Sequence, residues 1–140
     1  MAKPTPRPRG GHRVICLFSA ATTVMLLTGS ITLSWQHSVE KTRWEEQYRA
    51  EGPSLRLVRA SVQGSGAGME PPPEARLLHG RWHWQPNLRL PQVTLAGSGF
   101  TGEYTLCFSS GRCHPLSHWL PAGHAVTLAS CESEANWSHY

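Results

Sequence analysis

Residues 31–39, Ile-Thr-Leu-Ser-Trp-Gln-His-Ser-Val, decide the fold class of this chain. Apolar and polar residues alternate without a break from Ile31 through Trp35. A period of two is typical of a β-strand with one face buried and the other in water. The segment therefore predicts a half-buried strand, and the alternation places five residues on one of its faces: Ile31, Leu33, Trp35, His37 and Val39.

Shorter strand candidates follow this segment, separated by turn residues at intervals of roughly 8–12 positions. His79-Gly80 is placed to make a tight hairpin turn between two of them. The 13 glycines and 11 prolines also favour turns over long helices. We predict an all-β fold, a small antiparallel sandwich or a partly closed barrel. The strand candidates are residues 54–62, 76–78, 82–84, 92–96, 103–108, 112–114 and 125–128, with 44–50 as a strand or one helical turn and 117–120 as one helical turn.

The charge is distributed unevenly along the chain. The formal net charge is +4, and residues 1–13 contain four basic residues and no acidic one. Positive and negative residues balance in the rest of the chain. Because prolines stand at positions 4, 6 and 8, this stretch predicts an extended, disordered basic arm. We expect a single β domain over residues 14–131 to follow it, with residues 132–140 as a frayed tail.

Residues 14–27 allow two interpretations. They are uncharged and follow a basic arm, as the apolar core of a signal peptide or short membrane anchor does. Serine and threonine at 19, 22 and 23 weaken a membrane helix. The same residues are compatible with a first hairpin made of strands 14–18 and 23–27.

The composition excludes several classes of function. All 9 acidic residues are glutamates, so a Ser-His-Asp triad, an aspartic protease dyad and an EF-hand loop are ruled out. The chain has neither a Walker A loop nor a dinucleotide-binding fingerprint. Its basic residues outside the arm form no predicted cluster, which argues against a nucleic-acid partner. We therefore expect no catalytic residues, no cofactor and no metal.

The densest polar cluster of the sequence contains His37, Glu40, Glu45 and Glu46. It can be interpreted as a cation site or an acid–base pair, or as a strand histidine followed by an exposed charged loop. Trp44 lies in the same stretch, and Trp82 and Trp84 share a face of a predicted strand. Tryptophans at this spacing are typical of core packing, with a ligand-stacking platform as the alternative.

A glycine-rich loop precedes three consecutive prolines. Its candidate contact residues are Gly64, Gly66, Gly68 and Met69. Backbone N–H groups of such a loop can hold an anion, but phosphate loops normally lead into a helix, which the prolines preclude here. We expect a docking loop instead, because glycine allows close approach of a partner.

Three strings of this sequence resemble a bacterial domain-of-unknown-function family, the one numbered eighteen-fifty. They are His-Ser-Val-Glu-Lys-Thr-Arg-Trp-Glu-Glu at 37–46, Gly-Ser-Gly-Ala-Gly-Met-Glu-Pro-Pro-Pro at 64–73, and Leu-Cys, Gly-Arg-Cys and Pro-Leu between 106 and 116. The resemblance covers about residues 14–131 and favours the hairpin interpretation of 14–27. Members are often encoded beside TRAP transporters of the TAXI type, and no activity is established for the family.

The four cysteines allow three disulfide pairings. Cys107 and Cys113 flank a five-residue segment, so a hairpin would bring them opposite each other at bonding distance. Cys16 and Cys131 lie near the two ends of the expected domain, and a bridge between them would close a long loop. Free buried thiols are the alternative, and they are the expected state in a reducing cytoplasm.

These features together predict a non-enzymatic accessory protein. The resemblance implies a TRAP transporter permease or its binding protein as the partner, and the basic arm suits an anionic membrane surface. The alternatives are a small ligand- or metal-binding module and an enzyme based on His37 and a glutamate. We expect the chain at the inner membrane, cytoplasmic if 14–27 is a hairpin and periplasm-facing if it is a signal or anchor.

Overall fold

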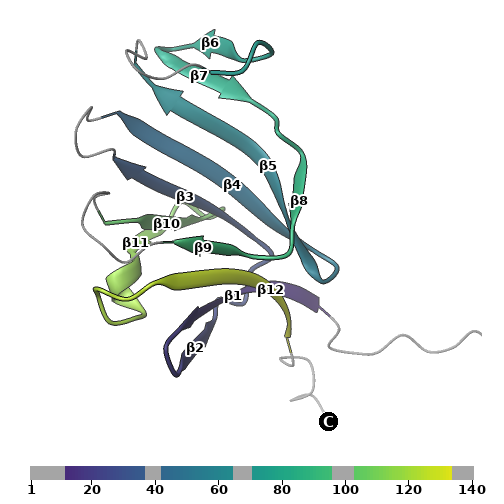
Figure 1. The fold of residues 1–140 in the computed structure, drawn as a ribbon, viewed down its shortest axis with the longest axis vertical. Coiled ribbons are helices and arrows are strands. Elements are labelled where there is room, and N and C mark those ends of the chain that lie inside the picture. The colour runs from purple at the N-terminus through teal and green to yellow at the C-terminus, as the bar shows by residue number, and fades with distance from the viewer. Residues whose placement is uncertain (1–11, 37–41, 65–70, 96–102, 134–140) are drawn as a thin grey trace, which may run out of the picture.

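The computed structural model describes residues 12–36, 42–64, 71–95 and 103–133, which form twelve strands and one short 3-10 helix (Figure 1). In chain order the elements are β1 (His12–Ser19), β2 (Thr22–Met25), β3 (Ser30–Gln36), β4 (Arg43–Glu51), β5 (Ser54–Gln63), β6 (Arg76–Leu78), β7 (Arg81–Trp84), β8 (Leu88–Leu90), β9 (Val93–Leu95), β10 (Thr105–Phe108), β11 (Cys113–Pro115), η1 (Leu116–His118) and β12 (Val126–Ser133).

The strands form two antiparallel sheets that pack as an open sandwich. The small sheet has the order β2-β1-β12-β9, and the large sheet has the order β11-β10-β3-β4-β5-β7-β6, with β8 also paired to β5. The sheets are not closed into a barrel. Figure 1 shows β6 and β7 at the edge of the large sheet that lies farthest from the small sheet. The predicted all-β, antiparallel class is confirmed.

The core lies between the sheets and is built from aliphatic residues of both. Ile15 and Leu17 of β1 and Leu128 of β12 are 0% exposed, and so are Leu33 of β3 and Leu106 of β10. Full burial of each such side chain stabilises the fold by about 1.5–3 kcal/mol. On the face of β3 predicted to be buried, Ile31 and Leu33 are buried and Trp35 is partly exposed, whereas residues 37–39 lie outside the described residues.

The first hairpin lies in the small sheet, and the chain that follows it leads to β3 of the large sheet. β1 and β2 pair antiparallel around a two-residue turn, which is the hairpin alternative for residues 14–27. The chain then bonds back to β1, since Ile15 N donates to Thr28 O at 2.9 Å and Leu26 N donates to Ile15 O at 3.0 Å. No helix among the described residues is long and apolar enough to cross a membrane.

β1 and β12 both extend beyond the limits predicted for the domain. His12 and Arg13 pair with Ser133 and Glu132, so these four residues belong to the small sheet rather than to a disordered arm or a frayed tail. The extension follows from the pairing of β1 with β12. The backbone N–H and C=O groups at the end of each strand bond to those of the other strand. The rest of the arm, residues 1–11, and the tail, residues 134–140, lie outside the described residues.

One continuous segment crosses between the sheets at their shared edge. β8 pairs with β5 in the large sheet, and β9, only two residues later, pairs with β12 in the small sheet. Pro91 lies between the two strands, at a position where a missing backbone N–H interrupts strand pairing. β8 was not among the predicted strands, because its three residues follow a proline and asparagine and precede this proline.

Candidate functional site

Four aromatic side chains follow one another across the inward face of the large sheet. The ring centroids of Tyr104 and Trp35 are 5.4 Å apart, and those of Trp35 and Trp44 are 6.2 Å apart with the planes at 4°. Trp84 continues the series with its centroid 6.5 Å from that of Trp44 and the planes at 84°. We call Tyr104, Trp35, Trp44 and Trp84 the aromatic row.

Strand register explains how the aromatic row forms. Trp35 of β3 lies directly opposite Trp44 of β4, which lies opposite Val62 of β5. Trp84 of β7 lies opposite Ala60, whose side chain is too short to separate Trp84 from Trp44. The three tryptophans therefore meet because adjacent strands place them on the same face, with only small side chains on β5 between them.

The aromatic row combines a buried side with an exposed side. Trp35 and Tyr104 pack against the hydrophobic core. All four residues of the row nevertheless remain partly exposed. Half-exposed tryptophan and tyrosine rings offer flat apolar faces and a negative quadrupole, so they can take up apolar groups, planar groups or cations.

A glutamate lies beside the aromatic row on the same face. Glu46 is two residues from Trp44 on β4 and stands between Leu33 of β3 and Ala60 of β5. The Tyr48 hydroxyl donates a hydrogen bond of 2.6 Å to Glu46 Oε1. Burial raises the pKa of Glu46, and this hydrogen bond opposes the rise. Burial, followed by the nearby charge of Glu46, raises the pKa of Tyr48.

The structure separates the acidic residues that the sequence places together. Glu45 lies on the outward face of the large sheet, where its carboxylate is 3.7 Å from Arg43 Nε and 3.5 Å from Arg81 Nη2. Glu46 lies on the inward face, because successive side chains of a strand point to opposite sides. The two glutamates belong to β4 rather than to a charged loop, so they do not form a shared site.

The remaining sequence-predicted candidates lie at the ends of the described strands or beyond them. Trp44 belongs to the aromatic row. Gly64 has φ at 106°, and a side chain there would meet Thr42 Cγ2 at 3.5 Å. The other five candidates lie outside the described residues: His37, Glu40, Gly66, Gly68 and Met69.

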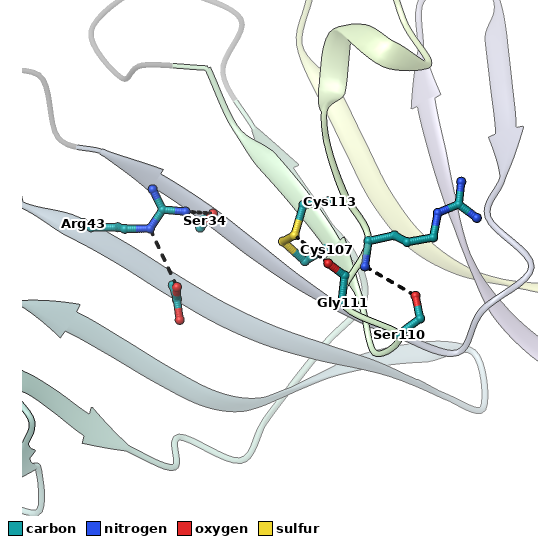
Figure 2. The surroundings of a disulfide bond; sticks show 8 residues. Ser34, Arg43, Cys107, Ser110, Gly111 and Cys113 are labelled. Atoms are coloured by element: carbon teal, nitrogen blue, oxygen red, sulfur yellow. Dashed lines mark hydrogen bonds and ion pairs between the residues drawn. A yellow bond between two sulfur atoms is a disulfide. The ribbon is translucent and has the colours of Figure 1, made fainter.

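Both pairs of candidate cysteines form disulfides. Cys107 and Cys113 lie opposite each other on β10 and β11 with their Cα atoms 4.0 Å apart. Figure 2 shows this bond near Ser34 and Arg43 of the adjacent strands, where Arg43 Nη2 donates to Ser34 Oγ at 2.9 Å. Cys16 and Cys131 join β1 to β12 with their Cα atoms 6.0 Å apart. With their thiols bonded, these cysteines cannot act as nucleophiles or as thiolate metal ligands.

A second aromatic cluster surrounds η1. The rings of His114 and His118 stack with centroids 4.0 Å apart, and Trp119 packs against both at right angles. Desolvation, then the nearby charges of His118 and Arg112, lower the pKa of His114. Among the residues that the structure describes, no group of three potential ligands lies close enough to hold a metal ion.

Sequence reasoning overlooked three residues that build the site: Trp35, Tyr48 and Tyr104 in their roles beside Trp44 and Glu46. The signal was present in residues 43–51, where Trp44, Glu46 and Tyr48 recur at every second position. A firm strand prediction for this segment would have placed Trp44, Glu46 and Tyr48 together on the face of β4 that continues the buried face of β3.

The fold and the site define an antiparallel β-sandwich with two disulfides and a half-exposed aromatic row on the larger sheet. The chain belongs to the family described as a domain of unknown function (DUF1850), whose model matches residues 31–116. The matched range is narrower than the resemblance expected over residues 14–131. It contains β3 to β11 and leaves out β1, β2 and β12. No curated protein and no solved structure matches the chain.

Proposed function

We propose that this chain is a non-enzymatic accessory protein of a TRAP-type transport system of the TAXI class, and that it acts by binding. The partner is the transporter permease or its binding protein. The aromatic row is the observation that carries the binding part of the proposal, because tryptophan and tyrosine supply much of the binding energy at protein interfaces. The transporter part rests on the resemblance, since relatives are often encoded beside such transporters.

Composition and redox chemistry support the remaining parts of the proposal. The sequence has no aspartate, and the aromatic row offers stacking surfaces rather than a nucleophile beside a base. Disulfides persist in compartments that keep thiols oxidised. The bonds Cys16–Cys131 and Cys107–Cys113 therefore favour the oxidising side of the inner membrane, in place of the cytoplasmic location that the hairpin at 14–27 was expected to imply.

Affinity capture from solubilised membranes tests the proposal. Immobilised wild-type protein should retain a transporter component, and the Trp44→Ala and Trp84→Ala variants should retain much less of it. Phe18→Ala is the matched control, because Phe18 is 37% exposed but lies on the small sheet. Capture of no transporter component by the wild type, or equal capture by all variants that keep the wild-type circular dichroism spectrum, would contradict the proposal.

Glu46 favours a second candidate function, the binding of a small organic cation. A carboxylate beside tryptophan faces is a combination that attracts quaternary ammonium groups and protonated amines. Choline should then quench tryptophan fluorescence, whereas its uncharged analogue with carbon in place of the ammonium nitrogen should not. Glu46→Gln should abolish the response to choline without affecting capture of the transporter component. An equal response to both compounds would exclude this candidate.

A further inference from the structure

The two disulfides differ in how easily an external thiol can reach them. We call Cys107–Cys113 the hairpin disulfide and Cys16–Cys131 the small-sheet disulfide. In the hairpin disulfide, Cys113 is exposed and Cys107 is partly exposed. In the small-sheet disulfide, Cys16 is only 2% exposed, although Cys131 is partly exposed. Because exposed disulfides are the labile ones in proteins, the hairpin disulfide is the candidate for exchange, and the other bond serves as an internal reference.

The position of β11 leaves one sulfur of the hairpin disulfide open to attack. β11 is an edge strand of the large sheet, and among the described residues no strand lies beyond it. On the other side of β10, Thr32 of β3 lies directly opposite Cys107. Figure 2 shows the bond beside the turn at Ser110 and Gly111. A thiolate attacks one sulfur from the side opposite to the sulfur that leaves, so β3 hinders attack on Cys107 Sγ and no described strand hinders attack on Cys113 Sγ.

Opening the hairpin disulfide should release β11 and leave the rest of the fold in place. β11 pairs with β10 at three positions, and one of them is Pro115, which has no N–H to donate. The chain after β11 is held separately, because Leu116 is buried in the core and its N–H donates to Tyr104 O at 3.0 Å. In contrast, the small-sheet disulfide joins β1 and β12, which pair at seven positions. The hairpin disulfide can therefore open and re-form within a folded domain.

We propose that the hairpin disulfide is an exchange site for a dithiol protein, and that its redox state controls the order of β11. A thiolate of the dithiol attacks Cys113 Sγ, the S–S bond breaks, and Cys107 Sγ leaves as a thiolate that takes a proton from water. The second thiolate of the partner attacks its own sulfur in the mixed disulfide and releases Cys113, which is protonated in turn. The partner is oxidised to a disulfide, and its two electrons reduce the two cysteines. This proposal does not depend on the transporter partner.

Trapping of the mixed disulfide on the full, oxidised chain tests the exchange step. The probe is thioredoxin with its second active-site cysteine replaced by serine, and acid quenching stops Cys107 from displacing it. Mass spectrometry of non-reduced peptides should find the probe on Cys113 in preference to Cys107. Attachment to Cys16 or Cys131 should be on the order of 100-fold less frequent, because attack there requires local opening of the small sheet. The Cys107→Ala/Cys113→Ala variant, which keeps only the small-sheet disulfide, is the matched control and should trap almost no probe.

Hydrogen exchange tests the control of β11. Dithiothreitol should open the hairpin disulfide before the small-sheet disulfide, and amide exchange should then rise in residues 105–115 but not in β1 or β12. Exchange that rises in β1 and β12 as well, or nowhere, would overturn the proposal. So would a control variant that traps as much probe as the wild type, or a wild type that traps the probe only in urea.

Discussion

The disulfide between Cys16 and Cys131 should contribute more to stability than the one between Cys107 and Cys113. The first joins residues 115 positions apart, and the second joins residues 6 positions apart. A cross-link stabilises a protein mainly by restricting the unfolded chain, and the restriction grows with the length of the closed loop. Loop closure gives about 5 kcal/mol for the first bond and about 2 kcal/mol for the second.

Urea unfolding followed by tryptophan fluorescence measures this difference. The Cys16→Ala/Cys131→Ala variant should lose about 5 kcal/mol of unfolding free energy and the Cys107→Ala/Cys113→Ala variant about 2 kcal/mol. Small domains are stable by only about 5–15 kcal/mol, so the first variant should be close to unfolding at room temperature. Mass spectrometry of non-reduced peptides should find both bonds in the wild type. Equal losses in the two variants, or thiols that alkylate freely in native wild-type protein, would refute the argument.

Three further predictions concern stability. Because burial raises the pKa of Glu46, the folded protein holds this proton to a higher pH than the unfolded chain does. The wild type should therefore lose unfolding free energy as the pH rises from the ordinary glutamate pKa through the raised value, and Glu46→Gln should lose less in urea titrations over this range. Leu33→Ala, at a position that is 0% exposed, should cost about 2–5 kcal/mol in the same assay. Gly80→Ala should lower the unfolding free energy by about 1 kcal/mol, because the β6–β7 turn holds Gly80 at a φ of 78°. His79→Asn should leave the unfolding free energy unchanged, because asparagine is a preferred residue at the φ of 52° that His79 adopts in this turn.

The sequence predicted the fold class because its local signals agree with the tertiary structure. Alternation at Ile31, Leu33 and Trp35 marks the buried face of β3, and His79-Gly80 makes the expected tight turn between β6 and β7. The cysteine pairs were also accessible, since a hairpin fixes the distance between Cys107 and Cys113. The sequence did not reveal how the strands divide between two sheets, because β8 and β9 change sheets within a few residues.

The candidate site was less accessible, because it depends on which strands are neighbours. Trp35, Trp44 and Trp84 come from three strands, and only the register of β3, β4, β5 and β7 brings their rings together. The gathering of arginines on the outward face of the large sheet was hidden for a similar reason. Summed along the chain, the charges of the domain cancel, but the large sheet places most of its arginines on one side.

Site-specific photocrosslinking tests most directly whether the aromatic row binds a transporter component. Positions 44 and 45 are adjacent in the chain but lie on opposite faces of β4, so they form a matched pair. A photoreactive phenylalanine analogue is placed at either position, and the protein is irradiated in native membranes. We predict that the analogue at Trp44 links the protein to the TRAP permease or its binding protein, and that the analogue at Glu45 does not. Crosslinking from position 45 alone, or no transporter component in the product from position 44, would contradict the account.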